Sequence, residues 1–600
     1  MRTSKETEAV TDAVAPPKTS RPVVHSNRGV VSSGHYLTSM AGLRMLLSGG
    51  NAFDAVVASC FAAAVVEPVA SYSLGAEAVF MLYDAESGDL LSLSGQGVAP
   101  RKATVEFFKD QGLDEIPTGP GPLAHLSFTV PGVVEALLSM LERYGTKRLA
   151  DVLEPSIEYA RQGMPHYEYM LKALDSTVTR EQFALYPPGG LDVFYDDGAV
   201  PKPGSLLVQP GLANTLEHMV AAESAASPGR AAGLRAARDA FHSGDIASSI
   251  VGSAQRVGGV MEIADLSGYH AKYEDPLRIM FAGHEICGQP TWTQGAVLLQ
   301  ALNILESFDL AAMGHNSPAY VHTVVEALKL CLADRQAYYG DPEFAEVPID
   351  GLLSKDYAAA RAQLIDAGHA VPELPAPGDP LRHSGGPARL GNSALQVSGG
   401  DEDGRPEEHG TTHVAALDNL GNMVCATPSG GAFAKSVFFP ELGFALSTRS
   451  EMFNFEEGHP NVLEPGKRPR TTLVNYFVLK DGVPVMTIGC PGGDYQAQAN
   501  LQLALNTLVF GMNPQEAIEA PRFASDSVPR SFYPHEYRPG QLSMESGFGT
   551  DTEDSLRELG HNVVRASVCG MGATVTRRDP DNGVMSAGAD PRRAAYAIGW

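Results

Sequence analysis

The chain has 600 residues, of which 44% are hydrophobic and 19% are charged, and its formal net charge at pH 7 is −26. A single hydrophobic core stops growing at about 250–300 residues, so this length predicts two core-forming units or one large multilayer fold. The negative charge repels nucleic acids and anionic lipid surfaces, which argues against both as partners.

The first part of the chain is polar. Residues 1–21 are rich in polar residues and prolines and predict a disordered tail, and they lack the apolar core of a secretory signal. No run of 18 apolar residues occurs anywhere, so we expect no transmembrane helix. The expected location is the cytoplasm.

Six cysteines are scattered along the chain: Cys60, Cys287, Cys331, Cys425, Cys490 and Cys569. They form no C-x-x-C pair and have no zinc-ligand spacing. Most lie in apolar stretches, which indicates small buried hydrophobic residues in a reducing compartment.

The first half of the folded region is predicted to be mainly helical. Residues 33–68 contain two helix-like apolar runs that two glycines at 49–50 separate, and Asn51 is placed to cap the second. Residues 77–95 predict a hairpin with its turn at 86–88. From 131 to about 366, apolar residues recur at three- and four-residue spacing, which is typical of helices.

Residues 367–410 are rich in Pro, Gly and charge, have no sustained period and predict a mobile linker. A strand, a turn and a second strand follow directly at 411–430, and another hairpin is predicted at 476–490. Helical patterns return at 500–511 and 554–560. Helices together with antiparallel strands predict an α+β fold of stacked layers.

Thr411 stands at the junction between the linker and a strand, where a self-cleavage would expose a new N-terminus. A freed N-terminal threonine has an α-amino group beside its own hydroxyl, so one residue supplies both nucleophile and base. From position alone, the pattern favours an ordinary β-forming threonine that opens a strand.

Two further segments contain groups that can take part in catalysis or in substrate binding. Gly492 and Gly493 follow a predicted strand, and paired glycines let backbone amides point at one oxyanion, although a plain turn also fits. Residues 466–472 (GKRPRTT) join three cations to the hydroxyls of Thr471 and Thr472, as an anion-binding loop or a solvated basic loop would.

The sequence contains no motif of a metal-dependent hydrolase or of a nucleotide-binding enzyme. The chain has no H-E-x-x-H motif or Asp/His cluster, so no metal is expected. It also has no G-x-x-x-x-G-K-[ST] loop or strand-borne G-x-G-x-x-G, and no cofactor is expected.

The chain resembles the γ-glutamyltransferase family from about Val23 onward. The segments that carry the resemblance are GGNAFDAVVA, VVEP, TVPGVVEALL, PKPGSLLVQPGLANTL, EALKLCLADRQAYYGDP, GTTHVAALDNLGN, PGKRPRTTL, PGGD and GADPRRAAYAIGW. The resemblance implies a four-layer αββα sandwich of the N-terminal-nucleophile hydrolase type. It also implies self-cleavage between Gly410 and Thr411, which would separate a large subunit (22–410) from a small catalytic subunit (411–600).

The family's site residues carry over one at a time. Thr411 matches the nucleophile, and Gly492 and Gly493 match the oxyanion-hole glycines. Ser429 falls where the family has a second threonine that hydrogen-bonds the nucleophile. Thr471 and Thr472 fall where γ-glutamyl enzymes have a serine pair that contacts the substrate carboxylate.

The acyl pocket departs from the family pattern. Gln96 stands where the family has the arginine that clamps the glutamyl α-carboxylate, and Gly431 replaces an asparagine. Met452, with Glu451 beside it, replaces the aspartate that binds the glutamyl α-amino group. Arg449 replaces a glutamine and is a candidate clamp for a single carboxylate, or a structural ion-pair partner of Glu451 or Glu456.

These features predict an autoprocessing hydrolase or acyltransferase that cleaves an amide or related acyl bond through an acyl-Thr411 intermediate. Family relatives with altered pockets suggest three alternatives: an oxamate-type amidohydrolase, a glutaryl (cephalosporin) acylase, and a C–C hydrolase of antibiotic alkylproline biosynthesis that releases an oxalyl group. The expected partners are a small acyl or amide substrate and the second chain of the same precursor, as a heterodimer or a dimer of heterodimers. An unprocessed, inactive binding protein is the alternative from another class.

Overall fold

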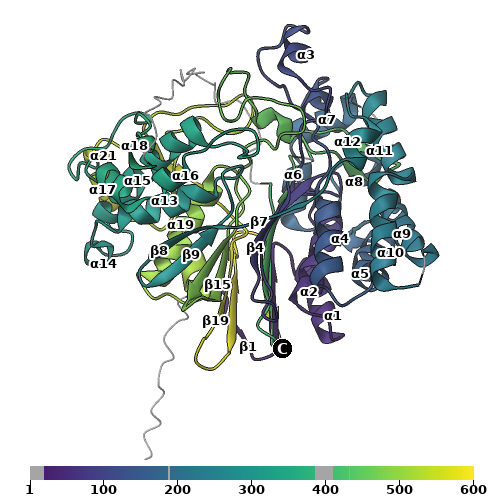
Figure 1. The fold of residues 1–600 in the computed structure, drawn as a ribbon, viewed down its shortest axis with the longest axis horizontal. Helices are drawn as coiled ribbons and strands as arrows, with labels where there is room; N and C mark the ends of the chain where they lie inside the picture. The colour runs from purple at the N-terminus through teal and green to yellow at the C-terminus, as the bar shows by residue number, and fades with distance from the viewer. Residues whose placement is uncertain (1–18, 187–188, 227, 385–409, 432) are drawn as a thin grey trace, which may run out of the picture.

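The computed structural model describes residues 19–186, 189–226, 228–384, 410–431 and 433–600. Two seven-stranded β-sheets face one another at its centre, and helices cover the outer face of each sheet (Figure 1). These four layers are the αββα sandwich that the family resemblance implied, so the predicted fold class is confirmed. No helix in the described ranges is both long and apolar enough to cross a bilayer.

All neighbouring strands of the first sheet, here sheet A, are antiparallel. In spatial order the strands of sheet A are β1 (Val24–Ser26), β20 (Met585–Ala589), β19 (Thr574–Arg578), β15 (Val483–Gly489), β14 (Tyr476–Lys480), β9 (His284–Gly288) and β8 (Leu277–Phe281).

The second sheet, sheet B, is also antiparallel throughout. In spatial order its strands are β21 (Tyr596–Gly599), β2 (Gly29–Ser33), β10 (Val414–Asp418), β11 (Met423–Ser429), β3 (Glu77–Tyr83), β4 (Leu90–Gly95) and β7 (Lys272–Glu274).

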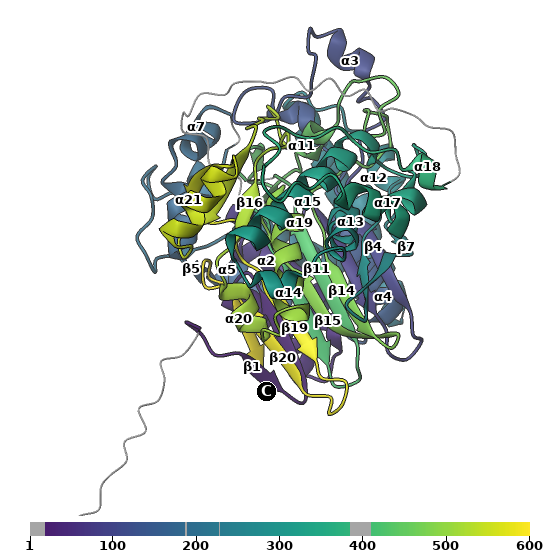
Figure 2. The same ribbon diagram turned by 90° about the vertical axis from the view of Figure 1, so that its left-hand side faces the viewer.

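The helices fall into two layers, seen edge-on in Figure 1 and from the side of sheet A in Figure 2. The main helices on the side of sheet B are α1 (Tyr36–Leu47), α2 (Ala52–Val66), α4 (Val133–Tyr144), α5 (Leu149–Gln162), α9 (Pro210–Ala225), α10 (Arg230–His242), α11 (Asp245–Arg256) and α12 (Ile263–Ser267). Those on the side of sheet A are α13 (Gly295–Leu305), α14 (Leu310–Met313), α15 (Pro318–Tyr338), α16 (Ile349–Leu352), α17 (Lys355–Ala362), α18 (Leu381–Ser384), α19 (Tyr495–Leu508), α20 (Pro514–Glu519) and α21 (Thr550–Glu558).

Shorter elements complete the chain. They are α3 (Val105–Lys109), α6 (Glu168–Leu174), α7 (Thr177–Leu185), α8 (Leu191–Phe194), the 3-10 turns η1 (Pro68–Ala70), η2 (Ala124–Ser127) and η3 (Arg449–Met452), and strands β5 (Met164–Pro165), β6 (Leu206–Leu207), β12 (Phe438–Phe439), β13 (Phe444–Ala445), β16 (Phe523–Ser525), β17 (Gln541–Glu545) and β18 (Asn562–Ala566).

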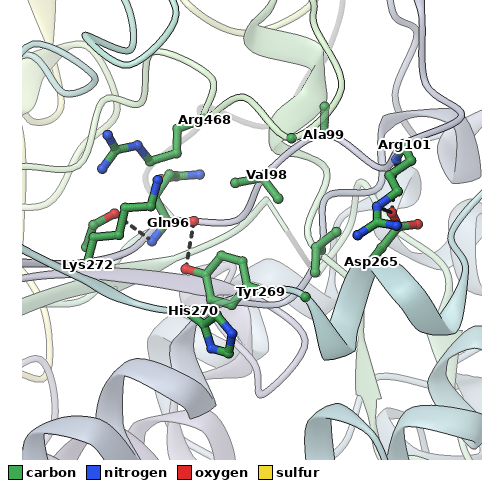
Figure 3. Close-up of a pocket in the computed structure, with 13 residues that line it drawn as sticks. Gln96, Val98, Ala99, Arg101, Asp265, Tyr269, His270, Lys272 and Arg468 are labelled. Atoms are coloured by element: carbon green, nitrogen blue, oxygen red, sulfur yellow. Dashed lines mark hydrogen bonds and ion pairs between the residues drawn. The ribbon is translucent and has the colours of Figure 1, made fainter.

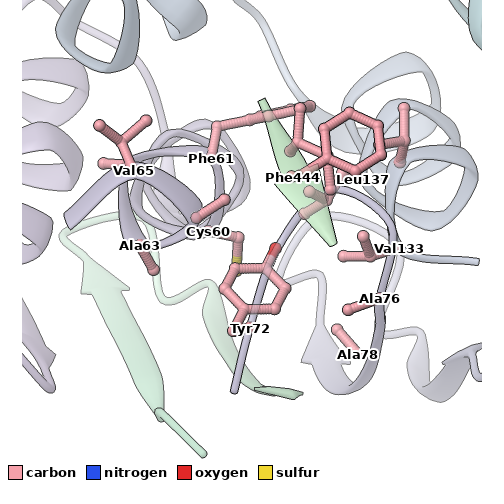
Figure 4. Close-up of a cluster of buried hydrophobic side chains, with 14 of the residues drawn as sticks. Cys60, Phe61, Ala63, Val65, Tyr72, Ala76, Ala78, Val133, Leu137 and Phe444 are labelled. Carbon is pink, nitrogen blue, oxygen red and sulfur yellow. The ribbon is translucent and has the colours of Figure 1, made fainter. Parts of the chain in front are cut away.

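Apolar side chains fill each interface between layers. All 15 residues of α2 are buried, as expected for a helix that is apolar on every side. Phe61 and Cys60 of α2 pack in a cluster with Tyr72, Val133 and Leu137 (Figure 4). A separate cluster lies between the sheets and includes Met81, Cys425 and Phe477. All six cysteines are free and buried, which confirms their predicted role as small hydrophobic residues.

Several local predictions are confirmed. Asn51 caps α2 through a reciprocal pair of hydrogen bonds with Asp54, and Gly49, with φ of 82°, follows the end of α1. The three predicted hairpins are β3–β4, β10–β11 and β14–β15, each joined by a short turn that contains glycine.

Two stretches differ from the prediction. The region predicted to be helical, 131–366, also contains the hairpin β8–β9, because Leu277, Ile279 and Phe281 alternate with outward-facing residues. Residues 367–384, expected to belong to a mobile linker, lie against the protein. The backbone amides of Val371 and Gly378 donate to the carboxylates of Glu326 and Asp334, at 3.1 and 2.9 Å respectively. The rest of that predicted linker, 385–409, and most of the predicted tail, 1–18, lie outside the described residues.

Candidate active site

Thr411 lies just before β10, at the end of sheet B, with 1% of its surface exposed. Its backbone is held in line with the sheet because the amide of Thr412 donates to the carbonyl of Pro428, at 3.2 Å. The Thr411 hydroxyl contacts the carbonyl oxygen of Gly410 and lies 3.2 Å from Oγ of Ser429, the last residue of β11. The three predicted residues Gly410, Thr411 and Ser429 therefore meet.

A buried acid–base pair holds the same stretch of backbone. Arg593 donates to the carbonyl oxygen of Thr411 and lies 3.2 Å from Glu67. Glu67, which follows α2, also accepts hydrogen bonds from the hydroxyls of Thr412 and Thr38, at 2.9 and 2.8 Å. Burial raises the pKa of Glu67, while Arg593 and the two hydroxyls oppose that rise.

The predicted oxyanion glycines form a tight turn after β15. Gly492 has φ of 133° and Gly493 has φ of 54°, values that a side chain would strain. The side-chain amide of Gln294 donates to the carbonyls of Gly493 and Thr472, at 3.1 and 2.7 Å, and so joins this turn to the Thr471–Thr472 segment.

Gly572 lies beside both Arg593 and the start of the glycine turn. A Cβ built on Gly572 would lie 3.3 Å from Cδ of Arg593 and 3.5 Å from Cγ of Pro491, the residue before Gly492. Gly572 thus has little room for a side chain between the turn and Arg593, the residue that holds the Thr411 carbonyl.

A cavity of about 870 Å³ opens beside Gly410 and Ser429. Its volume is in the range of pockets that bind small molecules, about 300–1,000 Å³. Helices α6 and α7 contribute one wall, and the η3 turn contributes Arg449. Aromatic rings line it at four positions: Tyr167, Tyr169, Phe433 and Phe532.

Arg449 lines this cavity and also forms a buried ion pair. Its Nε donates to Oε1 of Glu77 at 2.8 Å, and its guanidinium stacks on the ring of Phe532, with 5.3 Å to the ring centre. The sequence predicted Glu451 or Glu456 as the partner in the structural alternative, but the ion-pair partner is Glu77, which strand β3 brings opposite Ser429 of β11. Burial raises the pKa of Glu77 to about 7, against the opposing effect of Arg449.

Glu451 has different partners. It accepts a hydrogen bond from the backbone amide of Tyr533, at 3.2 Å, and lies 3.5 Å from the ammonium group of Lys435. Lys435, rather than Glu451, lines the large cavity. Burial lowers the pKa of Lys435, and the carboxylate of Glu451 opposes this shift.

Gln96 does not line the large cavity beside Gly410 and Ser429. It lines a second, smaller cavity of about 160 Å³ together with Tyr269, Lys272 and Arg468 (Figure 3). The Tyr269 hydroxyl donates to the Gln96 carbonyl at 2.9 Å, and the Gln96 side chain donates to the carbonyl of Gly97 at 3.3 Å.

The three cations of the basic loop 466–472 are buried rather than solvated. Lys467, Arg468 and Arg470 are each at most 6% exposed. Arg468 is paired with Asp341 at 2.7 Å and Glu274 at 3.0 Å, because burying a guanidinium requires a compensating charge. Burial excludes the solvated-loop interpretation, and the ion pairs of Arg468 give that residue a structural role.

Three buried groups at the site were not singled out from the sequence: Glu77, Glu67 and Arg593. The signal for Glu77 is a carboxylate at the start of a strand, EAVFMLY, that is otherwise apolar and buried. Glu67 and Arg593 lie within the family-like segments VVEP and GADPRRAAYAIGW, where only three-dimensional contact reveals their shared role.

One group outside the site has metal-ligand character: His322, Glu326 and His561, all buried. Glu326 is already paired with Lys329 at 2.7 Å. His322 lies 2.9 Å from a ring nitrogen of His561 and 2.8 Å from the Asp366 carbonyl. These contacts account for the cluster without a metal, so we assign none to it.

Two facing antiparallel sheets between helical layers, with a candidate nucleophile at the end of a central strand, define the class of N-terminal-nucleophile hydrolases. The family model for gamma-glutamyltranspeptidase matches residues 38–600, and the chain belongs to that family.

Curated relatives and solved structures agree. The chain is 32% identical over 589 residues to a glutathione hydrolase-like YwrD proenzyme of Bacillus subtilis, covering 96% of this chain and 99% of that protein. It is 31% identical to the acylase ACY 1 proenzyme of a Pseudomonas species, over 94% of this chain and 92% of that one.

Among solved structures, LmbA2991HD is 40% identical with a TM-score of 0.89, covering 97% of this chain and all of that one. A cephalosporin acylase from Bacillus halodurans is 28% identical with a TM-score of 0.82, covering 99% of both chains. The protein is therefore an enzyme of the γ-glutamyltransferase-like hydrolase type.

Proposed function

We propose that this protein is a proenzyme that cleaves itself between Gly410 and Thr411, and that the freed Thr411 then transfers acyl groups from small substrates. The observation that carries the proposal is the contact between the Thr411 hydroxyl and the Gly410 carbonyl, which joins nucleophile and target across the same peptide bond. Relatives named as proenzymes support it.

The proposed self-cleavage uses this contact as its starting point. The Thr411 oxygen attacks the carbonyl carbon of Gly410, the carbon–nitrogen bond breaks, and the departing amine keeps a proton that comes from the hydroxyl. Water then hydrolyses the resulting ester and releases the Gly410 carboxylate. The contacts of Arg593 and Thr412 hold the threonine backbone while its hydroxyl moves.

Catalysis reuses the same oxygen. The α-amine of Thr411 accepts the hydroxyl proton as the oxygen attacks the substrate carbonyl, and Ser429, within hydrogen-bond distance, orients that oxygen. The backbone amides of Gly492 and Gly493 would stabilise the oxyanion, a role that contributes about 3–4 kcal/mol in other acyl-transfer enzymes. The leaving group departs with a proton, and water or an amine removes the acyl group from Thr411.

The position of Arg449 favours a substrate whose acyl group ends in one small anionic group. Its guanidinium lines the cavity next to Ser429, while Gln96, at the position expected to clamp a glutamyl α-carboxylate, lies in the other cavity. Oxalyl and glutaryl groups fit this arrangement, and the likeness to a cephalosporin acylase favours the same class. A γ-glutamyl group needs a second partner for its ammonium, and we assign none.

A denaturing gel and mass spectrometry of the purified protein test the cleavage. We expect two fragments, with the smaller beginning at Thr411, and a single uncut chain for Thr411→Ala. Thr411→Ser, which keeps the hydroxyl, should still be cut. A smaller fragment that begins at another residue would contradict the proposal, and a wild-type chain that stays intact would favour an inactive binding protein.

A hydrolysis screen tests the acyl group. N-oxalyl and N-glutaryl p-nitroanilides should be turned over faster than γ-glutamyl p-nitroanilide. The reverse order would contradict the assignment of Arg449. Adding glycylglycine as an amine acceptor separates the two types of reaction, since only a transferase would speed up.

A further inference from the structure

Arg449, which lines the large cavity, forms an ion pair with Glu77, which lies behind it and does not line the cavity. Arg449 and Glu77 are 1% and 0% exposed, and Nε of Arg449 donates to Oε1 of Glu77 at 2.8 Å. The second carboxylate oxygen, Oε2, is buried and accepts no well-formed hydrogen bond among the described residues. The hydroxyls of Ser447 and Thr129 lie near this carboxyl and lower its pKa, but burial outweighs them. Water cannot compensate a buried oxygen of this kind, so the ionised carboxylate is poorly stabilised there.

Apart from the exposed Lys172, the cations that line the cavity are paired with acids. Each deeply placed cation that lines it has an acidic partner within 3.5 Å: Arg449 with Glu77, Lys435 with Glu451, Arg593 with Glu67, and Arg592 with Asp590. A substrate anion that binds at Arg449 therefore adds one uncompensated negative charge to a desolvated site. Such a charge is costly in a low-dielectric environment unless a proton accompanies it.

We propose that Glu77 is a positioning residue that takes up a proton when an anionic acyl group binds to Arg449. The positive charge of Arg449 is then balanced by the substrate carboxylate instead of by Glu77. No covalent bond changes in this step: the proton moves from solvent to the carboxylate, and Nε of Arg449 keeps its hydrogen bond to Oε1. The inference rests on the proposed function, because it assumes that Arg449 faces the acyl group.

The charged groups around the pair favour Glu77 as the proton acceptor. On the side of Arg449 stand Lys435 and its partner Glu451, and Tyr269 faces Glu77 with a pKa far above its ordinary value. Glu77 has the orphaned oxygen, and burial raises its pKa to about 7.

The other carboxylates are better stabilised. Glu67 accepts bonds from two hydroxyls as well as from Arg593, and the cations Arg522 and Arg592 hold the pKa of Asp590 below its usual range. Both oxygens of Glu67 and of Asp590 thus accept hydrogen bonds, whereas only one oxygen of Glu77 does, so the proton is assigned to Glu77.

Proton uptake by Glu77 predicts the direction in which the affinity for an anionic acyl group changes with pH. Below a pH of about 7, Glu77 is already protonated in the free enzyme, and anion binding needs no further proton. Above that pH a proton must be gained, so the affinity for an anionic acyl group should fall by about tenfold for each pH unit. A neutral acyl group of the same length binds without this requirement, and its KM should stay flat.

Steady-state kinetics test this difference. The wild-type mature enzyme is assayed with N-glutaryl and N-pentanoyl p-nitroanilide, which differ in the terminal carboxylate, between about pH 6 and pH 9. We expect KM for the glutaryl substrate to rise with pH and KM for the pentanoyl substrate to stay constant. The Thr411 amine titrates in the same range, but it changes kcat for both substrates alike.

Variants assign the effect to Glu77. Glu77→Gln keeps a hydrogen-bond acceptor for Arg449 but cannot be protonated, so its KM for the glutaryl substrate should become independent of pH. Glu77→Asp keeps a titratable group and should keep a pH-dependent KM. The matched control is Glu154→Gln, which removes a carboxylate from an exposed surface pair with Arg44 and should leave the wild-type profile intact.

Calorimetry of the wild-type protein covers the case in which a variant does not fold. Glutarate is titrated into the mature enzyme at about pH 8 in two buffers of different ionisation enthalpy, which gives the number of protons taken up. We expect an uptake that approaches one proton, and none when the neutral butyramide binds. Glutarate binding without proton uptake would overturn the inference.

The outcomes separate the two claims. If the wild-type chain is not cut, or hydrolyses neither anilide, the proposed function fails. If it is cut and active but KM for the two acyl groups follows pH identically, the proposed function stands and the role of Glu77 is wrong. A Glu77→Gln enzyme that keeps the wild-type pH profile of KM would also contradict the inference.

Discussion

Arg449 and Glu77 depend on one another because neither charge can reach bulk water. Leaving one partner of a buried ion pair uncompensated costs about 3–5 kcal/mol, whereas removing both charges is often neutral. We therefore expect Arg449→Met to lower the melting temperature well below that of wild type. The double variant Arg449→Met/Glu77→Gln should recover most of the loss. Equal melting temperatures for single and double variants would contradict the pairing.

The same pair predicts how stability changes with pH. The folded pKa of Glu77 is about 7, above its ordinary value of 4.5. A raised folded pKa means that the contribution to stability is fully present below about pH 4.5 and is lost as the pH rises through 7. Replacing Glu77 by Gln should flatten this part of the profile, measured as melting temperature against pH. An unchanged slope between wild type and Glu77→Gln would show that the carboxylate titrates normally.

Residue-scale prediction succeeded where a residue type and its neighbours in sequence define the chemistry. Asn51 was identifiable as a cap because its partner Asp54 lies three residues away. Glu77 was not identifiable as a partner of Arg449, because 372 residues separate them and only the β3–β11 register places Glu77 opposite Ser429. Gln96 shows that a match to a family motif can also mislead. Its position in the motif predicted a substrate contact, but it does not line the large cavity beside Gly410 and Ser429.

At the scale of elements, helix α2 links the core to the backbone around Thr411, the proposed nucleophile. Its N-terminus is capped by Asn51, and Glu67, which follows its C-terminus, contacts Thr412 and Arg593. We expect Glu67→Gln to slow self-cleavage at least tenfold, because Arg593 loses its counter-charge and the Thr411 carbonyl loses its fixed position. Appearance of the small fragment on a denaturing gel after expression measures the rate.

The other end of the same helix provides the control. Asn51→Ala removes the cap and should cost about 1 kcal/mol of stability, but it lies away from the cleaved bond and should leave the cleavage rate unchanged. If both variants slow cleavage equally, general destabilisation explains the effect and Glu67 has no specific role.

Helices and strands were predicted correctly where the residues that determine them lie close together in the sequence. The hairpins β3–β4, β10–β11 and β14–β15 have glycine-containing turns between apolar strands, and all three were found. The hairpin β8–β9 has a similar turn at residues 282–283, but the surrounding helical periodicity concealed its short alternating strands. The anchoring of residues 367–384 depends on distant acids such as Glu326 and Asp334, which composition alone cannot reveal.

At the scale of the whole molecule, the order of strands interleaves the two parts of the chain. Strands that precede Gly410 pair with strands that follow it in both sheets: β2 with β10 and β21, β3 with β11, β9 with β14, and β1 with β20. The family resemblance predicted two associated chains, but the sequence did not show that each sheet is built from both.

This interleaving predicts that cleavage does not release a subunit. Separating the fragments would break strand pairs at the centre of both sheets and expose the core between them, which is equivalent to unfolding. We expect the two fragments to co-elute on size exclusion when diluted to about 10 nM, and to separate only in denaturant, at the same midpoint as the loss of β-sheet signal. A matched Thr411→Ala precursor should unfold near the same midpoint, because its strand pairs are identical. Fragments that dissociate on dilution while keeping their circular dichroism would contradict the interleaved arrangement of the sheets.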